Sequence, residues 1–312
     1  MTVTGTPPST DVATAERLRT ATAGVRLSIS WLGVRRTLTR AQKSRAAEPF
    51  DAAGEYVAAS KKLLDTSHPA FKTVTAVRGR AVALWKALTL PFPEPGVRLI
   101  RHADIADFDQ RMTAFGAELA AAVAQLDARY DELRAAARGR LGQLYDPADY
   151  PARLRDEFAL AWDYPPVEPP AYLRRLAPEL YERECRRVAG QFDAAVELAE
   201  QAFLTEFGEL VAHLAERLSG CRDGRPKVFR DSAVDNLHEF FGRFRRLNIG
   251  SSDELERLVA DAQGLLRGVA PTKLRDSASL RREIGGALNR MGAELDQLLA
   301  DRPRRAVMRR DR

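Results

Sequence analysis

The side chains that most often carry catalysis or bind metals are few in this sequence and lie far apart. The four histidines are His68, His102, His213 and His238. Glu209 precedes His213 by one helical turn, which places two possible metal ligands on one face of a helix. A catalytic metal needs three or more convergent ligands, and the sequence places no third ligand close to His213 or His238. We therefore expect no metal site.

The sequence also lacks the motifs of nucleotide binding and of nucleophilic catalysis. It contains no Gly-Lys-Ser or Gly-Lys-Thr phosphate loop, no nucleophile elbow and no zincin motif. Gly285 and Gly286 lie inside a helical pattern, and Asp107 and Asp109 stand at a helix start, where the helix dipole already favours carboxylates. We expect no enzymatic activity, no catalytic residue and no cofactor.

Arginine residues, unlike the histidines, are clustered in this sequence, and the clusters lie near the two chain ends. The formal net charge is +6, and residues 301–312 alone hold six arginines against two aspartates. A second block, between Glu16 and Glu48, contains no acidic residue. Clustered basic residues can contact nucleic-acid phosphates. The candidate contacts are Arg26, Arg35, Arg36, Arg40, Arg304, Arg305, Arg309 and Arg310. The alternative is a pair of solvated ends, because arginine is abundant and lysine scarce throughout the chain.

A proline-rich segment is the second candidate for recognition. Residues 147–178 hold seven of the 17 prolines, which favours an extended polyproline II conformation. Such a segment can dock onto a protein that reads proline-rich chains. The candidate docking residues are Trp162, Tyr164, Pro165, Pro166, Pro169, Pro170 and Tyr172. The alternative is a structural one, in which these aromatic rings fold onto the prolines and cap the tip of a helical hairpin.

Two long apolar stripes predict the elements that carry these residues. From Phe108 to Leu144 and from Val188 to Leu218, apolar residues recur in steps of three and four that settle to an eleven-residue repeat. This repeat is typical of long, nearly straight paired helices. We predict a long antiparallel helical hairpin, or coiled coil, over residues 104–219, with its proline-rich tip at residues 145–178.

The remaining sequence predicts smaller units on either side of this hairpin. Residues 1–22 are polar and are expected to be disordered. Residues 23–103 predict one short strand, alternating from Val25 to Trp31, with Val97–Ile100 as its partner, and two helices. Residues 220–300 predict three helices, and residues 301–312 a basic tail. The expected fold class is all-α, with at most a small two-stranded β element.

The composition also predicts the compartment. The predicted helix between Cys185 and Cys221 would hold them about 50 Å apart, too far for a disulfide. No apolar run approaches the ~20 residues needed to span a bilayer, and residues 1–14 lack the apolar stretch of a secretory signal. We expect a cytoplasmic protein with free thiols and no membrane contact.

Several short pieces between residues 25 and 175 occur in an order that resembles an uncharacterised helical family. They are Arg26-Leu-Ser-Ile-Ser-Trp-Leu-Gly-Val-Arg-Arg, Lys61-Lys-Leu-Leu-Asp, Arg78-Gly-Arg, the strand from Arg98 to Ile100, Tyr130 and Tyr150-Pro151. The family is a domain of unknown function met in bacteria, their phages and plasmids. The resemblance implies an accessory protein, with a ring-forming ATPase as a possible protein partner, and it assigns no catalytic residue.

These observations predict a non-enzymatic interaction or scaffold protein. The alternative is an accessory factor that binds nucleic acid without sequence specificity, through its basic ends.

Overall fold

The computed structural model describes residues 10–219, 221–222, 225–226, 231–248 and 250–300. The chain folds into two compact units, and each draws on segments that are distant in sequence. Unit 1 comprises Met1–Gly24, Leu88–His102 and Pro165–Arg312, and unit 2 comprises Val25–Ala87 and Ala103–Tyr164. No helix in the described ranges combines the length and the apolar character that crossing a membrane requires.

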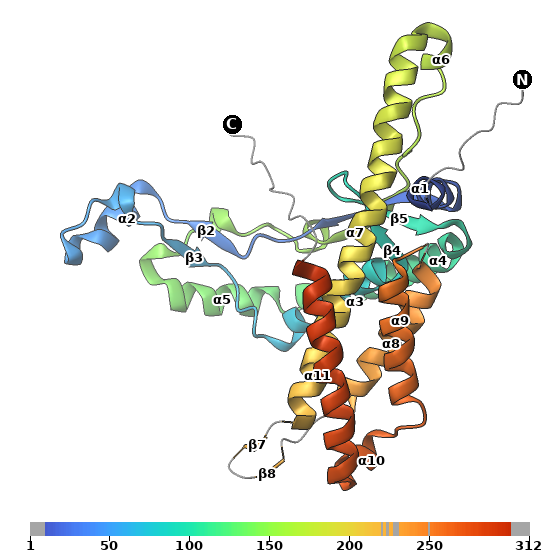
Figure 1. Cartoon of the computed structure of the whole chain (residues 1–312). Coiled ribbons are helices and arrows are strands. Elements are labelled where there is room, and N and C mark those ends of the chain that lie inside the picture. Colours follow the sequence, from blue (N-terminus) through green and yellow to red (C-terminus); the bar gives the residue numbers. More distant parts are fainter. Residues whose placement is uncertain (1–9, 220, 223–224, 227–230, 249, 301–312) are drawn as a thin grey trace, which may run out of the picture. The chain divides into compact units, whose positions relative to one another are not determined.

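Unit 1 is built around one long helix, α7, which spans Pro178–Ser219. Figure 1 shows α11 running alongside α7, and α1 and α8 also pack against α7. The predicted stripe from Val188 to Leu218 is buried in this packing. The other elements of unit 1 are α1 (Thr10–Ala21), β4 (Thr89–Pro91), β5 (Val97–Arg101), α6 (Leu173–Leu176), β7 (Cys221–Arg222), β8 (Arg225–Pro226), α8 (Ser232–Leu247), α9 (Asp253–Leu266), α10 (Pro271–Asp276) and α11 (Ala278–Ala300).

Phenylalanines fill the centre of the unit 1 core. Phe207 stacks on Phe240 with ring centroids 5.1 Å apart and planes inclined by 3°, and Phe203 meets Phe244 edge-on at 5.1 Å. Offset or edge-on ring pairs contribute about 0.5–1.5 kcal/mol beyond the area that they bury. These contacts join α7 to α8, the first of the three predicted C-terminal helices. All three are present, as α8, α9 and α11, with the short α10 between the last two.

Unit 2 has a separate core, formed by α3 (Pro69–Leu88), α4 (Ile105–Asp127) and α5 (Tyr130–Leu141). Phe71 and Val74 of α3 are buried in the same cluster as Leu126 of α4. The other elements are β1 (Thr22–Ser30), β2 (Arg35–Thr37), α2 (Arg40–Ala47), β3 (Ser60–Lys62), β6 (Ala159–Asp163) and the short 3-10 helices η1 (Glu48–Phe50), η2 (Gly54–Tyr56), η3 (His102–Asp104), η4 (Gly142–Leu144), η5 (Pro147–Asp149) and η6 (Arg155–Glu157).

The β structure corrects the predicted fold class. The protein is mostly helical, but it contains an antiparallel sheet with strand order β4-β5-β1-β6 and a two-stranded ribbon, β2-β3. The boundary between the units falls inside β1, after Gly24. The alternating residues Val25 to Trp31 are explained by β1, and the predicted partner Val97–Ile100 by β5. The all-α prediction is wrong because it missed β2, β3 and β4, which have three residues each, and β6, in which Leu160 and Trp162 are the only large apolar residues.

The predicted antiparallel hairpin is also wrong. The first stripe is divided between α4 and α5, and from Leu119 onward it lies in the core of unit 2, whereas the second stripe lies in the core of unit 1. Each stripe has its own partners, α3 for the first and α11, α1 and α8 for the second. An eleven-residue repeat reports which face of a helix is buried and carries no information about the partner.

The polar N-terminus contains a helix where disorder was expected. Helix α1 packs against α7 and buries Ala15 and Leu18 in the core of unit 1. Thr22 is buried as well, and its hydroxyl donates to the Leu18 carbonyl at 2.7 Å. Tertiary packing therefore orders a segment whose own composition is polar. The remainder of the predicted disordered segment, residues 1–9, lies outside the described residues.

Candidate functional surfaces

The histidines considered for catalysis lie on separate elements. His213 is on α7, His238 on α8, His102 in η3 and His68 just before α3. Among the residues that the structure describes, no group of three or more His, Cys, Asp or Glu side chains is placed to hold a metal ion.

The structure separates the arginines predicted to contact nucleic acid. Arg26 lies on β1 opposite Asp163 of β6, and its Nε is 3.3 Å from an Asp163 carboxylate oxygen. Arg35 and Arg36 lie on β2, and Arg40 begins α2. Of the eight candidates, Arg35, Arg36 and Arg40 lie in one local structure. Arg304, Arg305, Arg309 and Arg310 lie outside the described residues.

That local structure is an arm of unit 2, residues 34–63, in which the β2-β3 ribbon carries α2, η1 and η2 (Figure 1). The capping box of Thr39 and Gln42 starts α2. Gly54 allows η2 to approach α2 closely, because a Cβ at this position would lie 2.7 Å from the Ser44 backbone. The arm thereby holds two exposed rings, Phe50 (81% exposed) and Tyr56 (86% exposed).

Sequence reasoning missed these two rings. A proline at position 49 predicts a helix start, and Phe50 then appears to begin a buried helical face. Gly54 instead indicates a close approach of two backbone segments, because glycine is typical of places where two backbones meet closely.

The proline-rich segment is not the tip of a hairpin. Tyr150, Leu154 and Phe158 are buried in the core of unit 2. The Tyr150 hydroxyl donates to the Leu63 carbonyl at 3.0 Å, and the Tyr130 hydroxyl donates to the Pro151 carbonyl at 2.9 Å. Residues 145–164 therefore belong to unit 2, and the chain enters unit 1 at Pro165.

The aromatic residues that flank the prolines have different environments. Trp162 lies in β6 of unit 2, and its Nε1 donates to an Asp109 carboxylate oxygen at 2.8 Å. Tyr172 belongs to unit 1 and is 62% exposed. Burial raises the pKa of the Tyr164 hydroxyl, although this ring is still partly exposed. The Trp162 ring is thus held by a carboxylate and the Tyr172 ring is open to solvent, which argues against a proline tip covered by its own aromatics.

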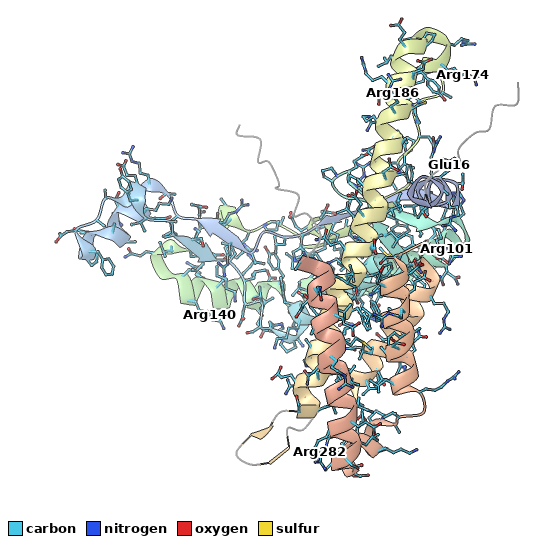
Figure 2. The ribbon with its side chains drawn as sticks, in the orientation of Figure 1. Glu16, Arg101, Arg140, Arg174, Arg186 and Arg282 are labelled. Carbon is cyan, nitrogen blue, oxygen red and sulfur yellow. The ribbon has the colours of Figure 1, made fainter. Side chains whose placement is uncertain are left out.

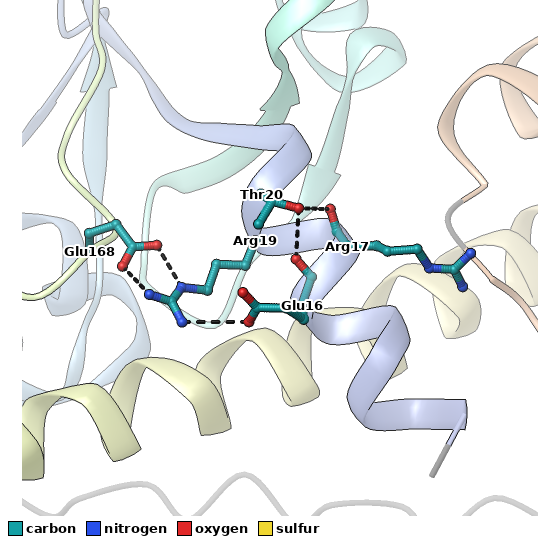
Figure 3. Close-up of polar contacts among 5 residues, drawn as sticks. All are labelled: Glu16, Arg17, Arg19, Thr20 and Glu168. Atoms are coloured by element: carbon teal, nitrogen blue, oxygen red, sulfur yellow. Dashed lines mark hydrogen bonds and ion pairs between the residues drawn. The ribbon is translucent and has the colours of Figure 1, made fainter. Parts of the chain in front are cut away.

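An ion pair fixes the proline run to unit 1. Figure 3 shows the Arg19 guanidinium facing Glu168, to which it donates two hydrogen bonds of 2.7 Å, with Glu16 on its other side at 3.5 Å. The Glu168 carboxylate raises the pKa of the Arg19 guanidinium. Val167 packs against the core of the unit. Pro165, Pro166, Pro169 and Pro170 therefore lie in an anchored segment and not on a free loop.

Beyond the prolines, residues 171–187 form a projection of unit 1 that we call the tip. It consists of α6 and the first ten residues of α7, which contact each other. No residue of the tip is buried, since the first buried residue of α7 is Val188. Tyr172 and Leu176 are exposed by 62% and 73%.

The tip is also basic. It contains five arginines and three glutamates. Arg187 bonds Glu184 at 2.7 Å and Gln191 at 2.9 Å. Within the described chain no ion pair is recorded for Arg174, Arg175, Arg183 or Arg186, and Figure 2 shows Arg174 and Arg186 at the end of the α6–α7 projection.

The sequence located part of the tip, through Tyr172, but it missed Leu176. That residue belongs to a Leu-Arg-Arg-Leu run that has no helical stripe of its own.

Comparison of the chain with protein-family models, with curated proteins and with solved structures found no match, so the resemblance to the bacterial helical family stays a prediction.

Proposed function

We propose that this chain is a non-enzymatic interaction protein that binds a protein partner through the tip. The observation that carries the proposal is the exposure of Tyr172 and Leu176 on a helical projection that buries none of its own side chains. Large apolar side chains on such a projection gain stability when a partner covers them, at about 25 cal/mol per Å² of apolar surface. Aromatic and arginine side chains are also the residues that most often dominate protein interfaces.

The length of α7 supports the same function. Its first ten residues extend about 15 Å beyond Val188, at ~1.5 Å per residue. A helix end with no buried face contributes little to the stability of its own fold, because helices in water gain most of their stability from packing. The tip therefore adds surface without adding core, as an element selected for binding would.

The charge of the tip indicates the character of the partner. Arg174, Arg175, Arg183 and Arg186 carry positive charge that no recorded ion pair within the described residues neutralises. A complementary surface would present carboxylates around an apolar patch. The ring-forming ATPases implied by the family resemblance are the first class of partner to test.

Crosslinking from a defined position tests this proposal. A photoreactive phenylalanine analogue replaces Tyr172 in one protein, and Leu198 in a control. Leu198 is also exposed and lies on the same helix, outside the tip. We expect a discrete adduct from position 172 and none from position 198.

The captured protein is then purified, and its affinity for variants of the full chain is measured by calorimetry. We expect Tyr172→Ala combined with Leu176→Ala to weaken binding by roughly 10-fold or more, as for interface hot spots, while Leu198→Ala leaves it unchanged. Identical adducts from both positions, or equal affinity of the two variants, would remove the tip as the binding site.

A further inference from the structure

The β2-β3 ribbon of the arm pairs like charges across its two strands. Arg35 stands opposite Lys62, and Arg36 stands opposite Lys61. Directly opposite residues in an antiparallel pair project from the same face, and like charges there are destabilising. An anion on either face of the ribbon would offset this repulsion.

Among the described residues, unit 2 supplies such an anion on the face of Arg36 and Lys61. Asp149 lies 2.5 Å from Lys61 Nζ and 4.0 Å from Arg36 Nε. Lys61 is buried and also donates to the Leu144 carbonyl at 2.7 Å. On the other face Arg35 and Lys62 are exposed. Neither side chain forms an ion pair with another described residue.

Helix α2 adds further cations to the arm. Arg40, Lys43 and Arg45 lie on it, again with no ion pair recorded within the described residues. The whole arm holds seven Lys and Arg residues against three Asp and Glu residues. A polyanion with regularly spaced charges is therefore the complementary ligand.

The two exposed rings indicate which class of polyanion the arm would bind. Phe50 and Tyr56 show no ring contact with any other described side chain, and they are the most exposed large apolar residues of the described chain. Proteins that bind single strands combine a basic track for the backbone with aromatic rings on which bases stack. In a duplex the base faces already cover one another and cannot reach such rings.

The acidic residues of the arm fit the same arrangement. Glu48, Asp51 and Glu55 are exposed in the η1–η2 region, where the rings lie. They repel phosphates from the rings and leave neutral bases as the favoured ligand there. Phosphates are then favoured at the ribbon and at α2, where the unpaired cations are.

A membrane surface fits the arm less well. A helix that lies on a bilayer needs a broad apolar face. The only apolar residues of α2 (Arg-Ala-Gln-Lys-Ser-Arg-Ala-Ala) are alanines.

We propose that the arm binds single-stranded nucleic acid, with Arg35, Lys62 and the cations of α2 on the phosphates and with Phe50 and Tyr56 stacking on bases. This site is separate from the tip, so it stands whether or not the tip binds a protein. The expected recognition is independent of sequence, because stacking and phosphate contacts are available to every base.

Fluorescence anisotropy of the full-length protein with labelled dT20 tests the proposal. We expect Phe50→Ala and Tyr56→Ala each to weaken binding by about 5- to 150-fold, the range that corresponds to the loss of one base stack. The combined variant Arg35→Ser/Lys62→Ser should reduce the dependence of log affinity on log salt by about 0.7 for each phosphate that the protein no longer neutralises. Glu55→Gln should tighten binding.

Four controls make the result decisive. Tyr172→Ala removes an exposed ring elsewhere, and Arg282→Ser removes an exposed cation of α11 (Figure 2); neither should change the affinity. Replacing Arg304, Arg305, Arg309 and Arg310 by Ser tests the basic C-terminal segment, and the effect of Phe50→Ala should persist in that background. Circular dichroism should show unchanged melting for Phe50→Ala, since the ring is exposed.

Three results would overturn the assignment. The first is equal affinity of wild type and Phe50→Ala/Tyr56→Ala for dT20. The second is affinity for a mixed-sequence duplex as high as for dT20, with the same dependence on both rings. The third is binding to phosphatidylserine vesicles that needs both rings while dT20 does not bind.

Discussion

Carboxylates attach irregular segments to both units. Glu168 fixes the proline run to α1 through Arg19, and Asp149 in η5 contacts Lys61 at the base of the arm. The two contacts differ in exposure. The Lys61 side chain is nearly buried, whereas those of Arg19 and Glu168 are exposed by 35% and 48%. Exposed pairs are screened by solvent and contribute much less than their short distances suggest.

A double-mutant cycle on Arg19→Gln and Glu168→Gln checks this reasoning. We expect a coupling energy of about 0.5–1 kcal/mol, because the bond is bidentate but partly solvated. Urea unfolding followed by circular dichroism measures it. The control is a cycle on Arg26 and Asp163, which are joined by one contact of 3.3 Å and should couple less strongly. Equal coupling in both cycles would contradict the role given to the bidentate geometry.

The carboxylate of Asp65 should give unit 2 a dependence on acid pH. Hydrogen bonds from Ser67, of 2.5 Å from its hydroxyl and 2.9 Å from its amide, together with Arg140 at 3.1 Å, lower the pKa of Asp65 to about 2. A carboxyl with a lowered folded pKa stabilises the fold above its unfolded pKa of about 3.9, and this contribution is lost as pH falls toward 2.

A carbon-detected NMR titration of the Asp65 carboxyl measures this pKa. We expect a midpoint near 2 in the wild type and a higher midpoint in Ser67→Ala, since the Ser67 hydroxyl makes the largest contribution. A wild-type midpoint near 4 would show that the carboxylate is not held by these donors.

At the scale of elements, the sequence predicted most helices and few of their partners. Helical patterns predicted α3, α7, α8, α9 and α11, because such patterns are local. The segments that were predicted wrongly are those whose conformation depends on tertiary contacts. Helix α1 is held by α7, and the region after Pro49 folds back on α2 at Gly54. A local pattern cannot report a close approach between backbones that meet only in the folded chain.

Gly250 tests one of these tertiary contacts. It connects α8 to α9 with φ of +101°, and a Cβ there would lie 2.9 Å from Thr14 Oγ1 of α1. Gly268, after α9, has φ of +70° and open space around it. We expect Gly268→Ala to cost about 1 kcal/mol from backbone strain alone. Gly250→Ala should cost about 2–3 kcal/mol, because Thr14 is buried and must also move.

Denaturant unfolding of the two glycine variants gives this difference directly. In Gly250→Ala, the amide hydrogens of α1 should also exchange faster than in Gly268→Ala, because the added methyl group displaces Thr14 of α1. Equal destabilisation by both substitutions would mean that α1 adapts to the added methyl group at no cost.

At the scale of the whole molecule, the apolar stripes predicted a mostly helical chain, but the units predicted at residues 23–103, 104–219 and 220–300 differ from the two units that the chain forms. The predicted pairing of the two stripes assumed that neighbours in sequence are neighbours in space. The two cores instead gather segments separated by more than a hundred residues, as α1 and α7 show. The basic block near the N-terminus includes Arg35, Arg36 and Arg40 of the arm, because charge clusters are visible in sequence, but the sequence did not predict the arm or its exposed rings.

Two substitutions test whether the cores are distinct. Phe207 lies in the core of unit 1 and Leu126 in that of unit 2, and both are fully buried. Phe207→Ala should cost about 3–5 kcal/mol and Leu126→Ala about 2–5 kcal/mol. Hydrogen exchange by mass spectrometry should place the loss of protection mainly in α7 and α8 for the first variant, and mainly in α3 and α4 for the second. Loss across both units in either variant would indicate a single cooperative core.

The distance along the chain between α1 and α7 has a consequence for synthesis on the ribosome. Unit 2 is complete once Tyr164 has left the exit tunnel, whereas unit 1 needs helices that end near Ala300. Ribosomes add roughly 5–20 residues per second, so about ten to thirty seconds separate the emergence of α1 from that of the start of α7. During this time Leu18 has no α7 to pack against, and the core of unit 1 around α1 is incomplete. Helix α1 therefore emerges before unit 2 but completes its packing after it, so α1 is exposed to chaperones and proteases while unit 2 is already formed.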